Sequence, residues 1–161
     1  LDEYSYEQQG RIPESEIARY QNMQKIGWAA NVDFTNSRET VLWKHFLTDN
    51  RYKGKDSNGE ELGVYEGACT YWRGAYRPTN ESMMRSNMHG FNVPSREAIY
   101  KRVMKVAYGP QWKFDYEEFV KFDLGHLPKP GSTQSRNAEA HVWPPLPAPQ
   151  FTNSTLRIEK F

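Results

Sequence analysis

The stretch that decides the fold class is residues 62–78, which read LGVYEGACTYWRGAYRP. It mixes β-branched and aromatic residues with three glycines. Such a composition is typical of strands that bulge or that pass close to a ligand. We therefore predict a pair of strands, forming a small sheet or hairpin region, within residues 62–78.

The segments on both sides of this stretch favour helices, so the predicted fold is α+β, mostly helical, with long loops. The predicted helices are 14–28, 39–47, 96–109 and 117–122, and a short strand is predicted at 31–34. Ser95 and the Asp115–Glu118 capping box start the last two helices, and Gly109-Pro110 ends the former. We expect Val41, Leu42, Trp43, Phe46, Phe119 and Phe122 to be buried, with Ile99, Val103, Val106 and Ala107 forming the apolar face of 96–109.

Composition excludes several classes of protein. The 161 residues carry 21 basic and 20 acidic side chains, without the long single-sign runs that bind nucleic acid or anionic membranes. No apolar run approaches the roughly 20 residues that a membrane-spanning helix needs. Cys69 is the single cysteine, which excludes an internal disulfide and favours a buried, inert thiol.

The chain divides by composition near residue 125. Residues 126–161 contain the segment PPLPAPQ at 144–150, which cannot form a helix or a central strand. We interpret residues 1–125 as part of a single larger domain. Residues 126–161 are interpreted as a proline-rich tail, in which the final TLRIEKF could add an edge strand. The start at Leu1, without a methionine or a leader, suggests a longer parent protein.

No complete catalytic constellation is visible in the residues themselves. His45, His89, His126 and His141 lack the three- to five-residue spacing of helical zinc ligands. A nucleophile elbow and the glycine-rich phosphate-binding motifs are also missing from the sequence. Function must therefore be sought in a longer pattern.

Three stretches together resemble the IgA-peptidase family of zinc metallopeptidases: LDEY at 1–4, YEGACTYWRGAYRPTNESMMRSN at 65–87, and FNVPSREAIYKRVMKVAYG at 91–109. Weaker similarity extends the match over most of residues 1–123. The resemblance implies the C-terminal sub-domain of a metzincin-like catalytic domain, downstream of a His-Glu-x-x-His zinc helix. It also implies export, to a secreted, periplasmic or cell-surface location.

The same resemblance implies a set of metal-site residues. Asp2, or alternatively Glu3, would be the third zinc ligand, and Met84 would be the methionine of the turn beneath the metal. Two imidazoles and a carboxylate leave a zinc position open for a nucleophilic water. Asp2 could equally cap a helix, and Met84 could simply fill the core. Without the upstream helix, Zn²⁺ is not expected to be retained by this chain.

The resemblance also implies residues that act on the substrate. Arg73, Tyr76 and Arg77 are candidates for orienting a peptide and stabilising the oxyanion, and Gly67 and Tyr71 are candidates for substrate binding. Relatives place a tyrosine two residues after the turn methionine, where this chain has Ser86, so Tyr76 or Tyr71 would have to substitute. Arg77-Pro78 could instead be a structural turn.

The predicted function is the substrate-facing portion of a zinc-dependent endopeptidase, inactive by itself. Its expected partners are a polypeptide substrate and the upstream part of the same protein, and neither nucleic acid nor a membrane span is expected. The alternative is a non-catalytic surface binding module, in which ten tyrosines and five tryptophans present aromatic side chains for protein or glycan recognition.

Overall fold

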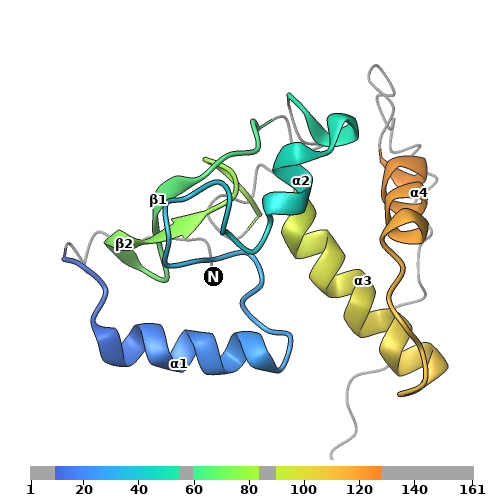
Figure 1. The fold of residues 1–161 in the computed structure, drawn as a ribbon, viewed down its shortest axis with the longest axis horizontal. Helices are drawn as coiled ribbons and strands as arrows, with labels where there is room; N and C mark the ends of the chain where they lie inside the picture. Colours follow the sequence, from blue (N-terminus) through green and yellow to red (C-terminus); the bar gives the residue numbers. More distant parts are fainter. Residues whose placement is uncertain (1–9, 55–59, 84–89, 128–161) are drawn as a thin grey trace, which may run out of the picture. The chain divides into compact units, whose positions relative to one another are not determined.

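The computed structural model describes residues 10–54, 60–83 and 90–127, all within the unit Leu1–Leu127. These residues form an α+β fold, as predicted (Figure 1). The elements in chain order are α1 (Glu14–Lys25), α2 (Lys44–Thr48), the 3-10 helix η1 (Asn50–Tyr52), β1 (Tyr65–Ala68), β2 (Tyr71–Arg77), α3 (Val93–Tyr108) and α4 (Tyr116–His126).

The predicted strand pair is confirmed as an antiparallel hairpin of β1 and β2. Ala68 pairs with Tyr71, so Cys69 and Thr70 alone form the turn, with φ of 54° and 69°. Positive φ at both central residues gives a turn whose twist matches that of the strands. The register shifts between Glu66 and Ala68, so that Gly67 of β1, with φ of 98°, lies opposite the extra residues that β2 carries between Tyr71 and Tyr76.

Both segments that flank α1 attach to β2. The Ile12 amide donates to the Arg73 carbonyl at 3.0 Å, and Asp33 and Tyr76 exchange two backbone hydrogen bonds of 3.0 and 2.7 Å. The strand predicted at 31–34 is thus reduced to a single bridge. One buried cluster joins these segments, α1 and the hairpin; it consists of Ile12, Tyr20, Ala29, Val32, Ala68, Cys69 and Ala75. The burial predicted for Cys69 is confirmed.

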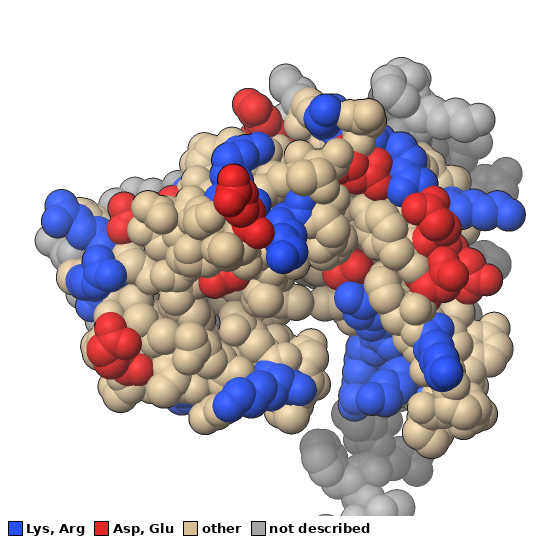
Figure 2. Space-filling model, viewed as in Figure 1, with Lys and Arg blue, Asp and Glu red and all other residues tan. Residues whose placement is uncertain are grey.

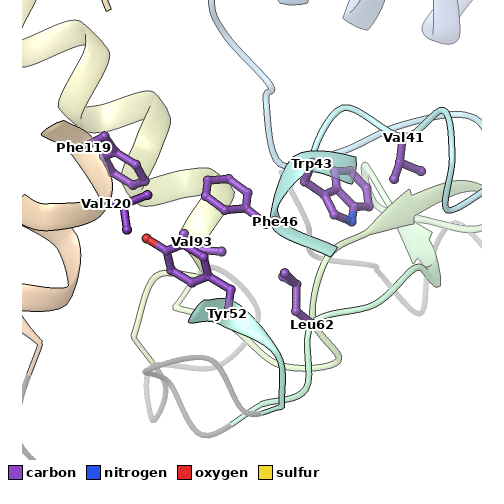
Figure 3. Close-up of a cluster of buried hydrophobic side chains, with 8 residues drawn as sticks. All are labelled: Val41, Trp43, Phe46, Tyr52, Leu62, Val93, Phe119 and Val120. Atoms are coloured by element: carbon purple, nitrogen blue, oxygen red, sulfur yellow. The ribbon is translucent and has the colours of Figure 1, made fainter. Parts of the chain in front are cut away.

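A second buried cluster joins α2, η1, α3 and α4 (Figure 3). Its members are Val41, Trp43, Phe46, Tyr52, Leu62, Val93, Phe119 and Val120. Phe46 lies at its centre, with ring centroids 5.0 Å from Tyr52 and 6.1 Å from Phe119. The Trp43 indole donates to the Gly63 carbonyl at 2.8 Å, which ties the loop before β1 to the same cluster.

Polar contacts complete the junction of η1, α3 and α4. Arg96 on α3 donates to both carboxylate oxygens of Asp123 on α4, at 2.7 and 2.9 Å, and the Tyr52 hydroxyl donates to the same carboxylate at 3.1 Å. Nearer the surface, Arg51 pairs with Asp49 and Glu117. The Arg51 hydrogen bonds outweigh partial desolvation and lower the pKa of Asp49 to about 2.

Two predicted helices begin or end elsewhere. The helix predicted at 39–47 is limited to α2, because Thr35 and Ser37 bond local backbone amides and the Leu42 amide donates to the Asp33 carboxylate at 2.8 Å. The predicted burial of Leu42 is wrong, since it is 45% exposed. α1 ends at Lys25, before Gly27, where φ is 87°.

The two later helices begin with side-chain caps. Asn92, and not Ser95, caps α3 by accepting from the Ser95 amide at 3.2 Å. The predicted Asp115 cap of α4 is confirmed by the bond from the Glu118 amide at 2.9 Å. Phe119 is buried as predicted, but the prediction for Phe122 is wrong, because that ring is 47% exposed. The face of α3 that carries Ile99, Val103 and Val106 is exposed as well.

Candidate functional site on the hairpin

Arg77 is a buried brace at the end of β2. Its guanidinium donates to the carbonyls of Glu66 and Gly67 in β1 and to the backbone and side-chain oxygens of Asn80. The residue is only 5% exposed. These contacts fix the irregular register at Gly67 and the turn after β2, which matches the structural alternative for Arg77-Pro78.

Gly67 and Arg77 are the candidate residues that the structure brings together. Gly67 is buried and adopts a φ of 98°, which L side chains rarely occupy. A Cβ atom at this position would lie 3.1 Å from Arg77 Nη1. Glycine is therefore required here both by the backbone conformation and by the close approach of the guanidinium.

Replacing Gly67 with alanine is expected to lower the free energy of unfolding by about 2–3 kcal/mol, combining backbone strain with displacement of Arg77. Gly27→Ala is the matched control, because Gly27 has a φ of 87° with nothing within 4 Å of the added Cβ. That variant should lose only about 1 kcal/mol. Urea unfolding followed by circular dichroism measures both, and equal losses would contradict the bracing role of Arg77.

Arg73 and Tyr76 differ from Arg77 in leaving their side-chain polar groups uncommitted. Within the described residues, neither the Arg73 guanidinium nor the Tyr76 hydroxyl makes a hydrogen bond or an ion pair. Arg73 is exposed, whereas the Tyr76 ring packs partly against the second buried cluster. Neighbouring strand residues face opposite sides of a sheet, so Tyr76 and Arg77 do not converge on one point. Tyr71 packs partly against the cluster around α1.

The connection from β2 to α3 is held at both ends by buried polar groups. The Thr79 hydroxyl donates to the Glu81 carbonyl at 2.8 Å and accepts from the Asn92 amide group at 3.3 Å. Thr79 and Asn92 are both fully buried. The Ser82 hydroxyl is buried without a hydrogen-bond partner in the described part of the chain. Ser82 opens the segment Ser82-Met83-Met84-Arg85, the predicted methionine turn.

The predicted metal-site residues cannot be placed. Asp2, Glu3 and Met84 lie outside the described residues. Across residues 10–54, 60–83 and 90–127, no group of three or more histidine, cysteine, aspartate or glutamate side chains could hold a metal ion. The same residues contain no helix long and apolar enough to cross a bilayer.

Sequence reasoning missed an ionic group between α2 and α3. His45 Nε2 lies 3.3 Å from Glu97 Oε1, and Lys101 Nζ lies 3.0 Å from Glu97 Oε2. Burial raises the pKa of Glu97, but the His45 hydrogen bond and the Lys101 charge outweigh it and hold this pKa below its ordinary value. Glu97, Lys101 and Lys105 are four residues apart, so the sequence could have predicted ion pairs along one face of this helix.

The described residues form an α+β fold. Its candidate site is the β1–β2 hairpin, which the Arg77 guanidinium holds in place. In comparisons with protein-family models, curated proteins and solved structures, nothing matched the chain.

Proposed function

We propose that this chain is the substrate-facing, C-terminal part of the catalytic domain of a zinc-dependent endopeptidase that resembles the IgA-peptidase family. The observation that supports it best is the braced connection from β2 to α3. Two of the three resembling stretches, 65–87 and 91–109, meet there, and Arg77, Thr79 and Asn92 anchor it. The bond from the Asn92 side chain to the Thr79 hydroxyl holds the two described ends of this connection next to each other.

The metal in this proposal would be held by Asp2, with Glu3 as the alternative, together with two histidines from an upstream His-Glu-x-x-His helix. Zinc bound there supplies a water that is nucleophilic near neutral pH. Met84 would pack beneath the ligands through its polarizable thioether. The upstream part of the same protein and a polypeptide substrate are the proposed partners, and export is the proposed localisation.

The residues of the hairpin receive two kinds of role. Tyr76 and Arg73 are the proposed substrate contacts, because their polar groups are uncommitted and a phenol or a guanidinium can donate to a developing oxyanion. Arg77 and Gly67 are proposed as positioning residues, since their atoms are used within the hairpin. Tyr71 would support the turn by packing.

The experiment compares this chain with a version extended upstream through the zinc helix. We expect the extended protein to contain close to one equivalent of zinc and to cleave fluorescent casein, while the 161-residue chain does neither. In the extended protein, Asp2→Asn should lose zinc, whereas Glu3→Gln should keep it. An extended protein without zinc, or with chelator-resistant cleavage, would refute the proposal.

A second variant pair tests the role of Tyr76 in the extended protein. Tyr76→Phe is expected to lower kcat by about 10²-fold, as loss of one oxyanion donor does. Tyr108→Phe is the matched control, because Tyr108 is 59% exposed at the end of α3 and should leave kcat unchanged. Equal activity of the two variants would remove Tyr76 from the catalytic step.

The exposed aromatic residues favour a second candidate function, a non-catalytic binding module for proteins or glycans. Trp28 is 59% and Trp72 is 37% exposed, and tryptophan is enriched at protein interfaces relative to the rest of the surface. The same zinc measurement separates the candidates. A metal-free extended protein that still binds a protein or a glycan through these tryptophans would favour the binding module.

A further inference from the structure

A hollow lies between the end of α1 and one face of α3. It has a volume of about 490 Å³. Its walls come from residues 24–28 and Ala30, from Leu42, Trp43 and His45, and from α3 side chains between Pro94 and Lys105. None of the candidate residues on β1 and β2 lines it.

The hollow is lined by an excess of positive charge. Lys25, Lys101, Arg102 and Lys105 line it against a single carboxylate, Glu97. Figure 2 shows basic side chains gathered on the α3 side of the opening beside α1. Lys101, Arg102 and Lys105 fall on one face of α3, because residues three and four apart are neighbours on a helix.

The charge excess is not cancelled within the described part of the protein. Glu97 is engaged by His45 and by Lys101, at 3.3 and 3.0 Å. Arg102 and Lys105 are exposed and form no ion pair with any described residue. Cations gathered in a recess concentrate their field there and attract negatively charged ligands.

The opposite wall is apolar and held in place. Ile26 is 73%, Trp28 is 59% and Leu42 is 45% exposed. The segment that carries the first two is fixed by paired bonds at the end of α1, from the Gly27 amide to the Gln24 carbonyl and from the Trp28 amide to the Met23 carbonyl, both 3.0 Å. Exposed apolar side chains beside uncancelled charge are typical of a recognition surface.

We propose that this hollow binds an acidic segment of a polypeptide, in which apolar side chains alternate with carboxylates, as a docking site separate from the hairpin. The carboxylates would pair with Lys25, Arg102 and Lys105. The apolar side chains would pack on Ile26, Trp28 and Leu42. Insofar as the bound polypeptide is the substrate, this inference rests on the proposed peptidase function, and the hollow would then select substrates by their charge.

The lining favours a peptide over single-stranded nucleic acid. Strand-binding proteins offer a series of aromatic platforms for successive bases. Here Trp28 is the one exposed tryptophan among the lining residues, because Trp43 is fully buried, and the His45 ring is engaged by Glu97. Ile26 and Leu42 supply aliphatic surface, which suits apolar side chains better than bases.

Fluorescence anisotropy on the 161-residue chain tests the proposal without zinc or hydrolysis. The probe is a fluorescein-labelled eight-residue peptide of alternating glutamate and leucine, and its control replaces each glutamate with glutamine. We expect the acidic peptide to bind at least about tenfold more tightly, and its binding to weaken as salt rises. Equal binding of the two peptides, or tighter binding of a labelled oligothymidine, would overturn the proposal.

Matched variants locate the binding. Arg102→Glu combined with Lys105→Glu should weaken the acidic peptide at least about tenfold, since both cations become repulsive. Lys113→Glu combined with Lys121→Glu makes the same charge change at exposed positions outside the hollow and should have little effect. Equal weakening by both pairs would overturn the site. The anisotropy measurement needs no catalysis, so the two proposals fail separately. An active peptidase that does not bind the acidic peptide refutes only this inference, and an extended protein without zinc refutes only the proposed function.

Discussion

Replacing Asp123 with asparagine is expected to lower the free energy of unfolding by about 3 kcal/mol. The Asp123 side chain is 3% exposed and accepts three donors, two from Arg96 and one from Tyr52. Asparagine keeps the shape but removes the charge and turns one acceptor into a donor that faces other donors. The Arg96 side chain, 18% exposed, would lose its ion pair with Asp123. Urea unfolding monitored by circular dichroism measures the loss.

Glu16→Gln is the control for this change, because it neutralises a carboxylate that also pairs with an arginine. The Arg19 and Glu16 side chains are 56% and 32% exposed, so the loss should stay within about 0.5 kcal/mol. The triple variant Tyr52→Phe, Arg96→Met and Asp123→Leu should recover most of the stability, since neither an unpaired charge nor an unpaired hydroxyl remains buried. A loss for Asp123→Asn no greater than that of Glu16→Gln would contradict the structural role of the pair.

Local signals predicted the parts of the fold that depend on neighbouring residues. Asp115 caps α4 because its carboxylate reaches the Glu118 amide, three residues away. The glycine at 67 marked the irregularity in the register, and the strand composition around it gave the hairpin. In each case the sequence contains both partners of the deciding contact within a few residues.

Burial was predicted less well, because it depends on what other segments cover. Leu42 stands in an apolar run, yet the bond from its amide to Asp33 directs the chain into a turn and leaves the side chain exposed. Phe122 lies one helical turn from the buried Phe119 and packs on Tyr100 of α3, but this contact leaves nearly half of its ring exposed. Periodicity identifies an apolar face without specifying how much of it is covered.

The sequence allowed the residues of the candidate site to be named, but not the contacts between them. The Arg77 brace requires the backbone at Gly67 to present two carbonyls to one guanidinium, and residue spacing cannot reveal such a contact. The ionic group of His45 and Glu97 joins residues 52 positions apart. Contacts of this kind follow from tertiary packing, which is also why the hollow beside α3 had no counterpart in the sequence patterns.

Replacing Phe46 with alanine is expected to lower the free energy of unfolding by about 4 kcal/mol, more than the loss expected for Asp123→Asn. Phe46 is fully buried. Its ring centroid lies 5.0 Å from Tyr52, 5.8 Å from Tyr116 and 6.1 Å from Phe119. Truncation therefore removes contacts to three rings on two elements, η1 and α4, and leaves a cavity that rigid aromatic neighbours cannot fill.

Phe122→Ala is the matched control, because it removes the same atoms from a ring that is 47% exposed and stacks on Tyr100 at 5.1 Å. Its loss should be about 1 kcal/mol, since less apolar area is returned to water and no closed cavity forms. Denaturant unfolding by circular dichroism compares the two. If Phe46→Ala lost no more than Phe122→Ala, the aromatic cluster would not be what holds α2 and η1 against α4, and the Arg51–Glu117 pair and the Tyr52–Asp123 hydrogen bond would have to hold η1 to α4 instead.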